Sequence, residues 1–512
     1  MMTQTKRKQR RQRGKNKTGQ QPFKQLVNHH APIDVLDEDA IALIHQGALQ
    51  VMAETGLEMW DSEARSILRQ AGTKVDEQAE RVWFDPEMVS ELIAHAPAEF
   101  TLLARDPQKN VHIGSNHIVF GSVGGPPFVS DLQEGRRPAI IEDLRNFNKL
   151  IHMTDVLTLG GGHLVEPSDL NPNTAHLDAA YYDIILTDKA SQGNGLGYQV
   201  TYDSLAMWAL GFSDGSLELE AALAAVNNKV ILMTVINVNS PLRYDGAMLQ
   251  GLMTLVRHGQ VPMITPFIFA GAMSPVSMPS AVMQQHAEVM AGITLAQAIG
   301  PGTPVVYGGF VSPLDMQSGA PSFGTPEAAW AQYAAAQMAR HIHVPLRSVG
   351  CLTTSQLADG QAAYESMFSL IPAVQSHTQI ITQAAGWLDG GLTAGYEKFI
   401  LDCELLRLAS GLCQKTAVTV ESLALPQIDE VGPGGHHLGT AHTMEHFRTA
   451  FYRSPLSSRL PYETWRDEGA VDVSQRAHLQ WQEILRNYEQ PPLNSAVNDA
   501  LLSYMERRKR ER

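Results

Sequence analysis

Cysteine is scarce in this chain of 512 residues, which contains only Cys351, Cys403 and Cys413 and no CxxC pair. We therefore expect no disulfide framework, and a reducing cytoplasm is the compartment that fits. The sequence also has no run of about 18 apolar residues, so a membrane-spanning helix is not expected. The hydrophobic fraction of 44% and the charged fraction of 18% are those of an ordinary globular protein, which at this length buries a large core without cross-links.

Positive charge is concentrated near the N-terminus, where the segment "KRKQRRQRGKNK" holds eight Lys and Arg residues and no acid. Because the whole chain has a net charge of −14, the remainder carries −22, and nucleic-acid binding by such an acidic body is disfavoured. No apolar segment follows, so this is not a signal peptide. We predict that residues 1–30 form a disordered basic tail, with RNA or anionic-surface contact as the alternative, and that the closing "RRKRER" is likewise solvated.

From about residue 111 the sequence becomes regular, because short apolar segments alternate with amphipathic helical stretches. The predicted strands lie at 117–124, 156–162, 190–197, 230–239, 262–271, 304–312, 345–353 and 378–386. Eight strand–helix units in succession are typical of a (β/α)₈ (TIM) barrel, an α/β fold that we place at residues 111–415. An open doubly wound sheet is the alternative, but the spacing is even and no GxGxxG follows the first strand.

Two further regions flank the predicted barrel. Residues 31–110 are predicted to form an N-terminal helical extension with one or two short strands, since "DEDAIALIHQGALQVMAETG" has helical spacing, acids in its first turn and Gly56 as a stop. Residues 416–512 are predicted to form a C-terminal loop and helices that pack on the barrel.

Functional residues of a (β/α)₈ barrel lie where strands end and loops begin. The predicted strand ends carry mainly uncharged polar and aromatic residues, namely His163, Asn194, Asn237, Asn239, Phe267, Phe269, Tyr307, Phe310, 353–356, Gln383 and Trp387. Acids are sparse there. A glycoside hydrolase requires two carboxylates, and a divalent-metal lyase requires several Asp or Glu ligands, so neither class is favoured.

Five blocks of sequence, in order, resemble the trimethylamine methyltransferase family. They are "EGRRPAIIEDLRNFNKLIHMTDVL" (134–157), "GAPSFGTPEAAWAQYAAAQMAR" (319–340), "SQLADGQAAYESM" (355–367), "AAGWLDGGLTAGYEKFILDCELL" (384–406) and "GPGGHHLGTAHTMEHFR" (432–448). The resemblance covers nearly all of the chain beyond the tail. It implies a (β/α)₈ barrel that moves a methyl group from a methylated amine to the Co(I) of a corrinoid (cobalamin), normally carried on a separate small corrinoid-binding protein, with no metal of its own.

Founding members of that family carry pyrrolysine, whereas this chain runs through "CLTTSQLADGQAAYE" in standard residues, with the corresponding position placed within Leu352–Asp359. In the family, pyrrolysine is proposed to activate a tertiary amine. A quaternary ammonium leaves as a neutral amine without such help, and homologues that lack pyrrolysine are associated with glycine betaine. The resemblance therefore favours a quaternary amine, with glycine betaine, proline betaine, carnitine and choline all open and with trimethylamine or another methylamine as the alternative.

A quaternary ammonium donates no hydrogen bond, so its recognition is expected to rest on aromatic faces. The candidates are Tyr307 and Phe310 first, then Phe267 and Trp387, with Phe269 and Phe323 also considered; core packing is the alternative for each. Donors to a substrate carboxylate are predicted to be His163, Asn194, Gln356 and His436. Arg347 begins a strand and is placed towards the wrong end of the barrel. Asp359, Glu365 and His442 are predicted to face the corrinoid. The alternative for the two acids is a helix start for Asp359 and a helix surface for Glu365. Glu397 could equally lie on a solvated helix face.

Four histidines, His436, His437, His442 and His446, lie in "GPGGHHLGTAHTMEHF" (432–447). A zinc site needs three or four converging ligands, and HTMEH is not the HExxH motif but closer to HxxEH, so we predict no metal here. The glycines instead suggest a loop that returns over the barrel mouth as a lid. A metal-dependent barrel hydrolase or lyase and a non-catalytic quaternary-amine binding protein stay open as alternatives, and a homo-oligomer is expected for a barrel of this size.

Overall fold

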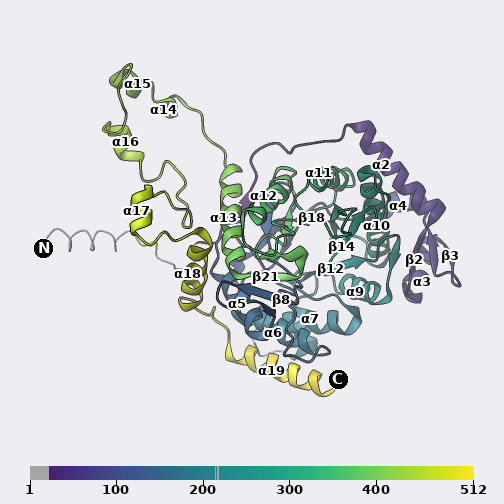
Figure 1. Cartoon of the computed structure of the whole chain (residues 1–512). Helices are drawn as coiled ribbons and strands as arrows, with labels where there is room; N and C mark the ends of the chain where they lie inside the picture. The colour runs from purple at the N-terminus through teal and green to yellow at the C-terminus, as the bar shows by residue number, and fades with distance from the viewer. Residues whose placement is uncertain (1–21, 214, 216–217) are drawn as a thin grey trace.

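The computed structural model describes residues 22–213, 215 and 218–512, so most of the predicted basic tail lies outside the described residues. At its centre is a nine-stranded sheet in which eight strands run parallel (Figure 1). The eight are β7 (His117–Phe120), β10 (Leu159–Gly161), β11 (Ala190–Gln192), β12 (Met233–Val238), β14 (Val261–Pro266), β16 (Val306–Gly308), β18 (Leu346–Val349) and β19 (Ile380–Thr382). Seven of the eight lie within a segment where the sequence predicts a strand, and β14 begins one residue before its predicted segment.

The sheet is curled, and its two ends approach each other. Its order is β1-β7-β19-β18-β16-β14-β12-β11-β10, so β7 pairs with the last parallel strand of the chain. A parallel bridge joins Gly121, just after β7, to Leu159 in β10. The Thr158 N–H also donates to the Phe120 carbonyl at 3.1 Å. The first and second predicted strands are thereby in contact.

Alternate side chains of these strands face inwards and form one apolar cluster. It includes Val119, Leu159, Ala190, Met233, Val261, Met263, Val306 and Ile380. A hairpin of β5 (Phe100–Leu102) and β6 (Val111–Ile113), with the short helix η2 (Pro107–Lys109) between the strands, adds its own apolar side chains to the cluster. The hairpin precedes β7 in the chain and so covers the amino ends of the strands, leaving the carboxyl ends for loops.

Helices alternate with the parallel strands and cover the sheet. They are α5 (Ile141–Met153), α6 (Ala175–Leu186), α7 (Gly197–Gly211), α8 (Leu219–Ala225), α9 (Gly246–Arg257), α10 (Met278–Ile299), α11 (Pro326–His341), α12 (Gly360–Gln375) and α13 (Tyr396–Leu412). α10 is buried on nearly all sides because it lies between the sheet and the N-terminal extension, which explains its apolar residues at every helical face. Among the helices of the described residues, none is long and apolar enough to cross a membrane.

Short strands at the carboxyl ends of the barrel strands shape the loops there. They are β8 (Phe128–Asp131), β9 (Gly135–Pro138), β15 (Ile268–Ala270), β17 (Val311–Pro313), β20 (Trp387–Leu388) and β21 (Thr393–Gly395), with the short helix η3 (Asp389–Gly391). β15 pairs with β17, and β20, β21, β8 and β9 form a separate sheet. These small sheets hold aromatic residues of the loops in place.

The N-terminal extension contains more strand than the sequence predicts. Its elements are α2 (Glu38–Gln50), the π-helical turn η1 (Val51–Thr55), β2 (Leu57–Met59), α3 (Ser62–Ala71), β3 (Lys74–Asp76), β4 (Arg81–Trp83) and α4 (Pro86–Ile93). β2, β4 and β3 form an antiparallel sheet, to which β13 (Arg243–Tyr244) adds. Strands of three residues are too short to show a period of two, which is why the pattern missed them.

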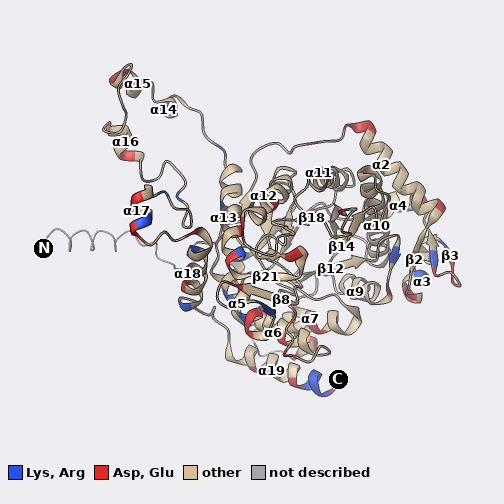
Figure 2. Cartoon of the chain, viewed as in Figure 1, with Lys and Arg blue, Asp and Glu red and all other residues tan. Residues whose placement is uncertain are grey.

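Of the two predictions of solvated ends, one is wrong within the described residues and the other is correct for most of its segment. Part of the predicted 1–30 tail forms β1 (Leu26–Val27), which pairs antiparallel with β7 and buries Leu26. The closing "RRKRER", blue at the C-terminus in Figure 2, ends a helix and is mostly exposed, but two of its four arginines are anchored by a buried carboxylate. Arg508 Nε and Arg512 Nη2 donate to Asp203 at 2.7 and 3.0 Å.

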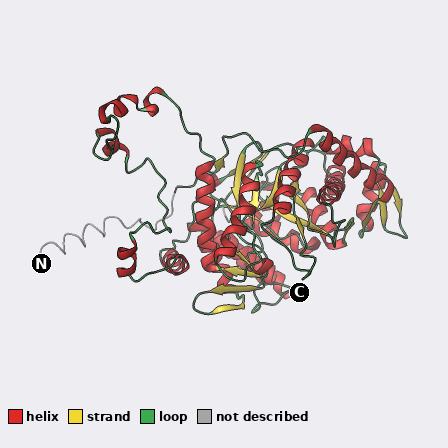
Figure 3. Cartoon of the chain, turned by 45° about the horizontal axis from the view of Figure 1, so that its top comes forward, coloured by secondary structure: helices red, strands yellow, loops and turns green. Residues whose placement is uncertain are grey.

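The C-terminal region divides into an outlying part and a packed part. Its helices are α14 (Val420–Leu423), α15 (Leu425–Val431), α16 (Ala441–His446), α17 (Tyr462–Asp467), α18 (Val473–Arg486) and α19 (Ser495–Arg510). α18 packs on α13 and α5, and α19 packs on α7 and α6. α14, α15 and α16 stand away from the body in both views (Figures 1 and 3).

The lid predicted for residues 432–447 is therefore not what the structure shows. The chain leaves α13 at its C-terminal end, where the His29 N–H donates to the Cys413 carbonyl at 3.2 Å, beside β1. This is the end of the sheet opposite the carboxyl ends of the strands, because α13 runs antiparallel to them. The outlying segment starts on the wrong side of the molecule to cover the mouth directly.

Glu397 of α13 anchors α18. The sequence allowed a solvated helix face for this residue, but Glu397 is only 4% exposed. Its carboxylate accepts hydrogen bonds from His478 Nδ1 at 2.6 Å and Trp481 Nε1 at 2.9 Å. Both donors belong to α18, so one buried carboxylate ties the C-terminal helices to the body.

We expect Glu397→Ala to lower the free energy of unfolding by about 2 kcal/mol, because two buried donors lose their acceptor. The change should appear as a lower melting temperature and as faster proteolysis between residues 413 and 472. Glu489→Ala, at an exposed position, is the control. Equal melting temperatures for both variants would contradict the anchoring role.

Candidate functional site

A cavity of about 480 Å³ opens at the carboxyl ends of the parallel strands. All eight strands, or the loops that directly follow them, contribute to its wall. The wall includes five of the eight predicted substrate-binding residues, which are His163, Asn194, Phe267, Phe310 and Trp387. These five come from the segments after five different barrel strands and meet only in the fold.

Three aromatic side chains form one side of the cavity. The rings of Phe267 and Phe310 have centroids 4.4 Å apart. Phe323 lies behind the wall and contacts both Phe310 and Trp387, with centroid distances of 5.9 Å in each case. Phe269 packs edge-on against Phe267 at 4.6 Å. Phe269 and Phe323 thus support the three wall aromatics, rather than facing the cavity themselves.

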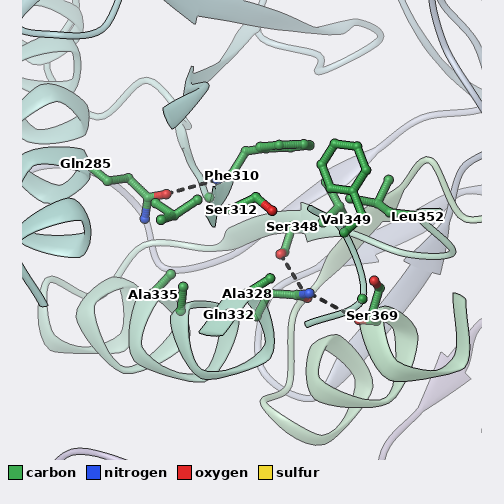
Figure 4. A pocket seen from close by; sticks show the side chains of 15 residues that line it. Gln285, Phe310, Ser312, Ala328, Gln332, Ala335, Ser348, Val349, Leu352 and Ser369 are labelled. Atoms are coloured by element: carbon green, nitrogen blue, oxygen red, sulfur yellow. Dashed lines mark hydrogen bonds between the residues drawn. The ribbon is translucent and has the colours of Figure 1, made fainter. Parts of the chain in front are cut away.

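Phe310 is held from behind by polar side chains of the surrounding helices (Figure 4). Gln285 of α10 accepts a hydrogen bond from the Phe310 N–H at 2.9 Å. Next to it, Gln332 of α11 accepts from Ser348 Oγ at 3.3 Å and donates to the Ser369 carbonyl at 3.2 Å. The space between them is a cavity of about 10 Å³, room for about one water molecule. Phe310 therefore has little freedom to move away from the mouth.

Tyr307 does not line the cavity, so its prediction as a substrate contact is wrong. Its side chain is fully buried on the outer face of β16, where its hydroxyl lies 3.4 Å from Gln285 Nε2 and 3.3 Å from His286 Nδ1. Burial raises the pKa of Tyr307 well above its usual range. Because side chains alternate along a strand, Tyr307 and Phe310, three positions apart, face opposite sides.

Polar and charged groups complete the cavity wall. Asn194 Nδ2 lies 3.2 Å from His163 Nδ1, and His163 Nε2 pairs with Glu166. Arg347 of β18 also lines the cavity, although the sequence placed it towards the wrong end of the barrel. It is buried, its Nη2 donates to Gln383 Oε1 at 2.6 Å, and burial lowers its pKa to about 10. A site with aromatic faces, amides and one buried guanidinium is suited to a small cationic or zwitterionic ligand.

Comparison with known proteins agrees with this chemistry. A family model described as trimethylamine methyltransferase matches residues 3–512. The chain belongs to the trimethylamine methyltransferase family.

Several relatives in the family are similar over nearly their whole length. Glycine betaine methyltransferase of Desulfitobacterium hafniense (strain Y51) is 37% identical over 93% of this chain and 98% of its own. Trimethylamine methyltransferase MttB of D. hafniense (strain DSM 10664 / DCB-2) is 26% identical over 92% of each chain. Proline betaine:corrinoid methyltransferase of Eubacterium limosum is 27% identical over 91% of this chain and 96% of its own.

A solved structure, the hydroxylamine complex of MtmB, superposes on 93% of this chain and 90% of its own with a TM-score of 0.51 and 10% identity. At that identity the likeness concerns the fold alone. It supports the assignment of a mixed α/β fold with a curled, largely parallel sheet, as the strand pairing also shows.

The loop in which we placed the family's pyrrolysine position, Leu352–Asp359, is held by acids that the sequence assigned to the corrinoid. Glu365 is buried and accepts from Thr353 Oγ1 at 2.5 Å and from the Thr354 N–H at 2.8 Å. Asp359 caps α12 by accepting from the Ala362 N–H at 3.0 Å, and this hydrogen bond lowers the pKa of its carboxyl. Both acids shape the loop, and neither lines the cavity.

The three remaining predicted site residues lie away from the cavity. Gln356 is exposed, and its amide donates to the Thr354 carbonyl at 3.0 Å. His436 is exposed on the outlying segment, and His442 of α16 packs its ring against His446, with centroids 4.7 Å apart. Within the residues that the structure describes, no group of three or more His, Cys, Asp or Glu side chains is arranged to hold a metal ion.

Asp183, which the sequence did not single out, supports the loop after β10. It is buried, accepts from Asn148 Nδ2 at 2.8 Å, and also accepts from the Gly162 backbone N–H. Burial raises its pKa to about 7. Gly161 and Gly162 have φ values of +66° and +80°, and a Cβ on Gly161 would lie 1.6 Å from Ser191 Oγ. The loop that presents His163 therefore depends on two glycines and one buried carboxyl.

The raised pKa of Asp183 predicts a pH-dependent contribution to stability. Between its ordinary value of 3.8 and about 7, the folded state binds more protons at this group than the unfolded state. Its contribution to the free energy of unfolding therefore falls as pH rises through that window. We expect the melting temperature of Asp183→Asn, measured relative to that of the native protein, to rise as the pH increases from 5 to 8. The melting temperature of Asp429→Asn, at an exposed position, should follow that of the native protein at each pH. A constant difference across this range would contradict the burial of an ionisable group here.

Proposed function

We propose that this member of the family moves a methyl group from a quaternary ammonium to the Co(I) of a corrinoid. The observation that carries the proposal is the aromatic wall of Phe267, Phe310 and Trp387 at the mouth of the sheet, since such faces bind a cation that donates no hydrogen bond. The 37% identity with a glycine betaine methyltransferase supports the same reaction class.

In this reaction the C–N electron pair would stay on nitrogen, so that a neutral tertiary amine leaves, and a bound corrinoid would supply the Co(I) electron pair for the new bond to the methyl carbon. No proton moves at the reacting atom, so the site needs no general base. Phe267 and Phe310 hold the ammonium in position, and the buried surroundings of Phe310 keep water from the reacting carbon.

We further propose that the curled sheet is a closed (β/α)₈ barrel spanning residues 111–415. The bridge between Gly121 and Leu159 supports closure, as does the likeness to MtmB. The extension at 31–110 and the C-terminal region at 416–512 are then additions to this barrel, of which α18 and α19 pack on its helices.

The methyl acceptor is proposed to be carried by a separate small corrinoid-binding protein that docks at the mouth. The exposed tip of the loop Leu352–Asp359, with Gln356 and Leu357, supports a contact surface beside the cavity. Asp359 and Glu365 would then act by shaping this loop. Self-association and a cytoplasmic location stay predictions from the sequence.

We expect the purified protein with reduced cobalamin to form methylcobalamin from glycine betaine but not from trimethylamine. A quaternary ammonium leaves as a neutral amine, whereas trimethylamine would have to leave as an amide anion or be activated first. Absorption spectroscopy of the cobalamin measures the product. Equal or faster turnover of trimethylamine would refute the leaving-group argument.

Loss of the aromatic wall should weaken substrate binding. We expect Phe310→Leu and Phe267→Leu each to raise the KM for glycine betaine about tenfold, because each removes a cation–π face of about 1 kcal/mol or more. Phe368→Leu, which changes an exposed aromatic of α12, is the matched control. Unchanged KM values in both wall variants would place the ammonium elsewhere.

A further inference from the structure

Arg347 is a buried cation that lacks a carboxylate partner. It is 3% exposed, and within the described residues no acid forms an ion pair with it. Its one described hydrogen bond is from Nη2 to Gln383 Oε1, and its Nε is buried without a partner. By contrast Arg65, which is also buried, pairs with Glu77 at 2.8 Å and Glu80 at 3.0 Å.

An unpaired buried charge is costly, because burial removes its hydration and nothing in the protein replaces it. Gln383 does not remove this cost, since a neutral amide oxygen compensates only part of a guanidinium's charge, and Thr382 Oγ1 already donates to the same oxygen at 2.5 Å. The fold thus retains at this position a cation that no contact within the protein requires. A ligand anion would compensate the charge of this guanidinium.

The surrounding cavity leaves that anion room and gives it a direction. Arg347 pairs in register with Gly308, and Phe310 follows Gly308 two residues closer to the mouth. The guanidinium therefore starts one inward-facing position deeper than the aromatic wall. Of the residues that line the cavity, Glu166 alone carries a carboxylate, and that carboxylate pairs with His163. An anion that enters reaches Arg347 without meeting an unpaired acid.

We propose that Arg347 binds the carboxylate of the substrate and so restricts the enzyme to zwitterionic betaines, in which a quaternary ammonium and a carboxylate belong to one small molecule. This inference rests on the proposed methyl transfer for its biological meaning, but it concerns binding alone. The guanidinium fork is the one charged donor of the Lys/Arg type among the described residues that line this cavity, and the Trp387 indole N–H and the Thr234 hydroxyl, both buried without a partner, are further donors in the same wall.

Binding of the carboxylate at Arg347 also orients the substrate for the reaction. With its carboxylate at Arg347, a betaine places its ammonium in the layer of Phe267 and Phe310, nearer the mouth. Its methyl groups then point towards the opening, which is the side from which a protein-borne acceptor must approach. Choline and trimethylamine lack the carboxylate, so they would leave Arg347 unpaired and have no fixed orientation.

The test is calorimetric binding of glycine betaine and of choline, without any corrinoid, to the native protein and three variants. We expect the native protein to bind glycine betaine about 100-fold more tightly than choline, and Arg347→Met to lose about 100-fold in affinity for glycine betaine only. Arg347→Lys should fall between them, because an ammonium keeps the charge but not the planar fork. Arg257→Met, the same change at an exposed arginine, is the matched control and should bind as the native protein does.

Thermal melting without ligand gives a second measurement. Arg347→Met should melt at or above the temperature of the native protein, because it removes an unpaired buried charge and Gln383 keeps its bond from Thr382. Glycine betaine should then raise the melting temperature of the native protein but not of this variant.

Three results would overturn the assignment: Arg347→Met that keeps native affinity for glycine betaine, choline that binds as tightly as glycine betaine, or no binding of glycine betaine at all. A different result would count against the proposed reaction alone: the native protein binds glycine betaine, Arg347→Met loses that binding, and no methyl group reaches reduced cobalamin. The binding role of Arg347 would then stand.

Discussion

The alternation of side chains along the parallel strands is the constraint on which the rest of the site depends. Each strand turns every second residue inwards, and in the deeper part of the sheet these residues make a single apolar cluster with the β5–β6 hairpin. One or two steps further along the same strands, the inward residues become Gln192, Thr265, Thr382 and then the wall aromatics. The transition from core to binding site is thus continuous, and the packed core fixes the direction of every wall residue.

Electrostatics follow from the same geometry. Two buried lysines show how the chain compensates a buried cation: Lys398 pairs with Asp402, with 2.6 Å between Nζ and Oδ2, and Lys189 Nζ donates to three backbone carbonyls at 2.6–2.7 Å. Burial raises the pKa of Asp402 to about 6 even so. Arg347 is different, because the residues opposite it are amide, hydroxyl and aromatic groups. A buried guanidinium with an unpartnered Nε in the wall of a cavity is the position where we propose that a ligand supplies the missing charge.

Much of the fold could be predicted from the sequence, because each barrel strand is an apolar segment followed by an amphipathic helix. The loop residues His163, Asn194, Phe267, Phe310 and Trp387 were found for the same reason, as the first polar or aromatic positions after each strand. Position near a strand end predicts Tyr307 wrongly, because it ignores the alternation of side chains that already separates Tyr307 from Phe310. The early position of Arg347 in β18 predicts the wrong end of the barrel, although its inward-facing position and long side chain carry the guanidinium into the cavity wall. No periodicity could predict the path of residues 414–470, because that path depends on where α13 ends in space.

The proposed displacement requires no general base, and the arrangement of the cavity is consistent with that requirement. A displacement in which no proton moves depends on where the ammonium is held and on what surrounds it, so rigid aromatic and amide groups are sufficient. The loop Leu352–Asp359, where we place the pyrrolysine of other family members, is here clamped by Glu365 and ends at the Asp359 cap. A loop fixed in this way supplies shape rather than a reactive group. The burden of substrate selection then falls on the two ends of the cavity, the aromatic wall for the cation and the buried guanidinium for the anion, and a substrate that satisfies both needs no chemical activation by the protein.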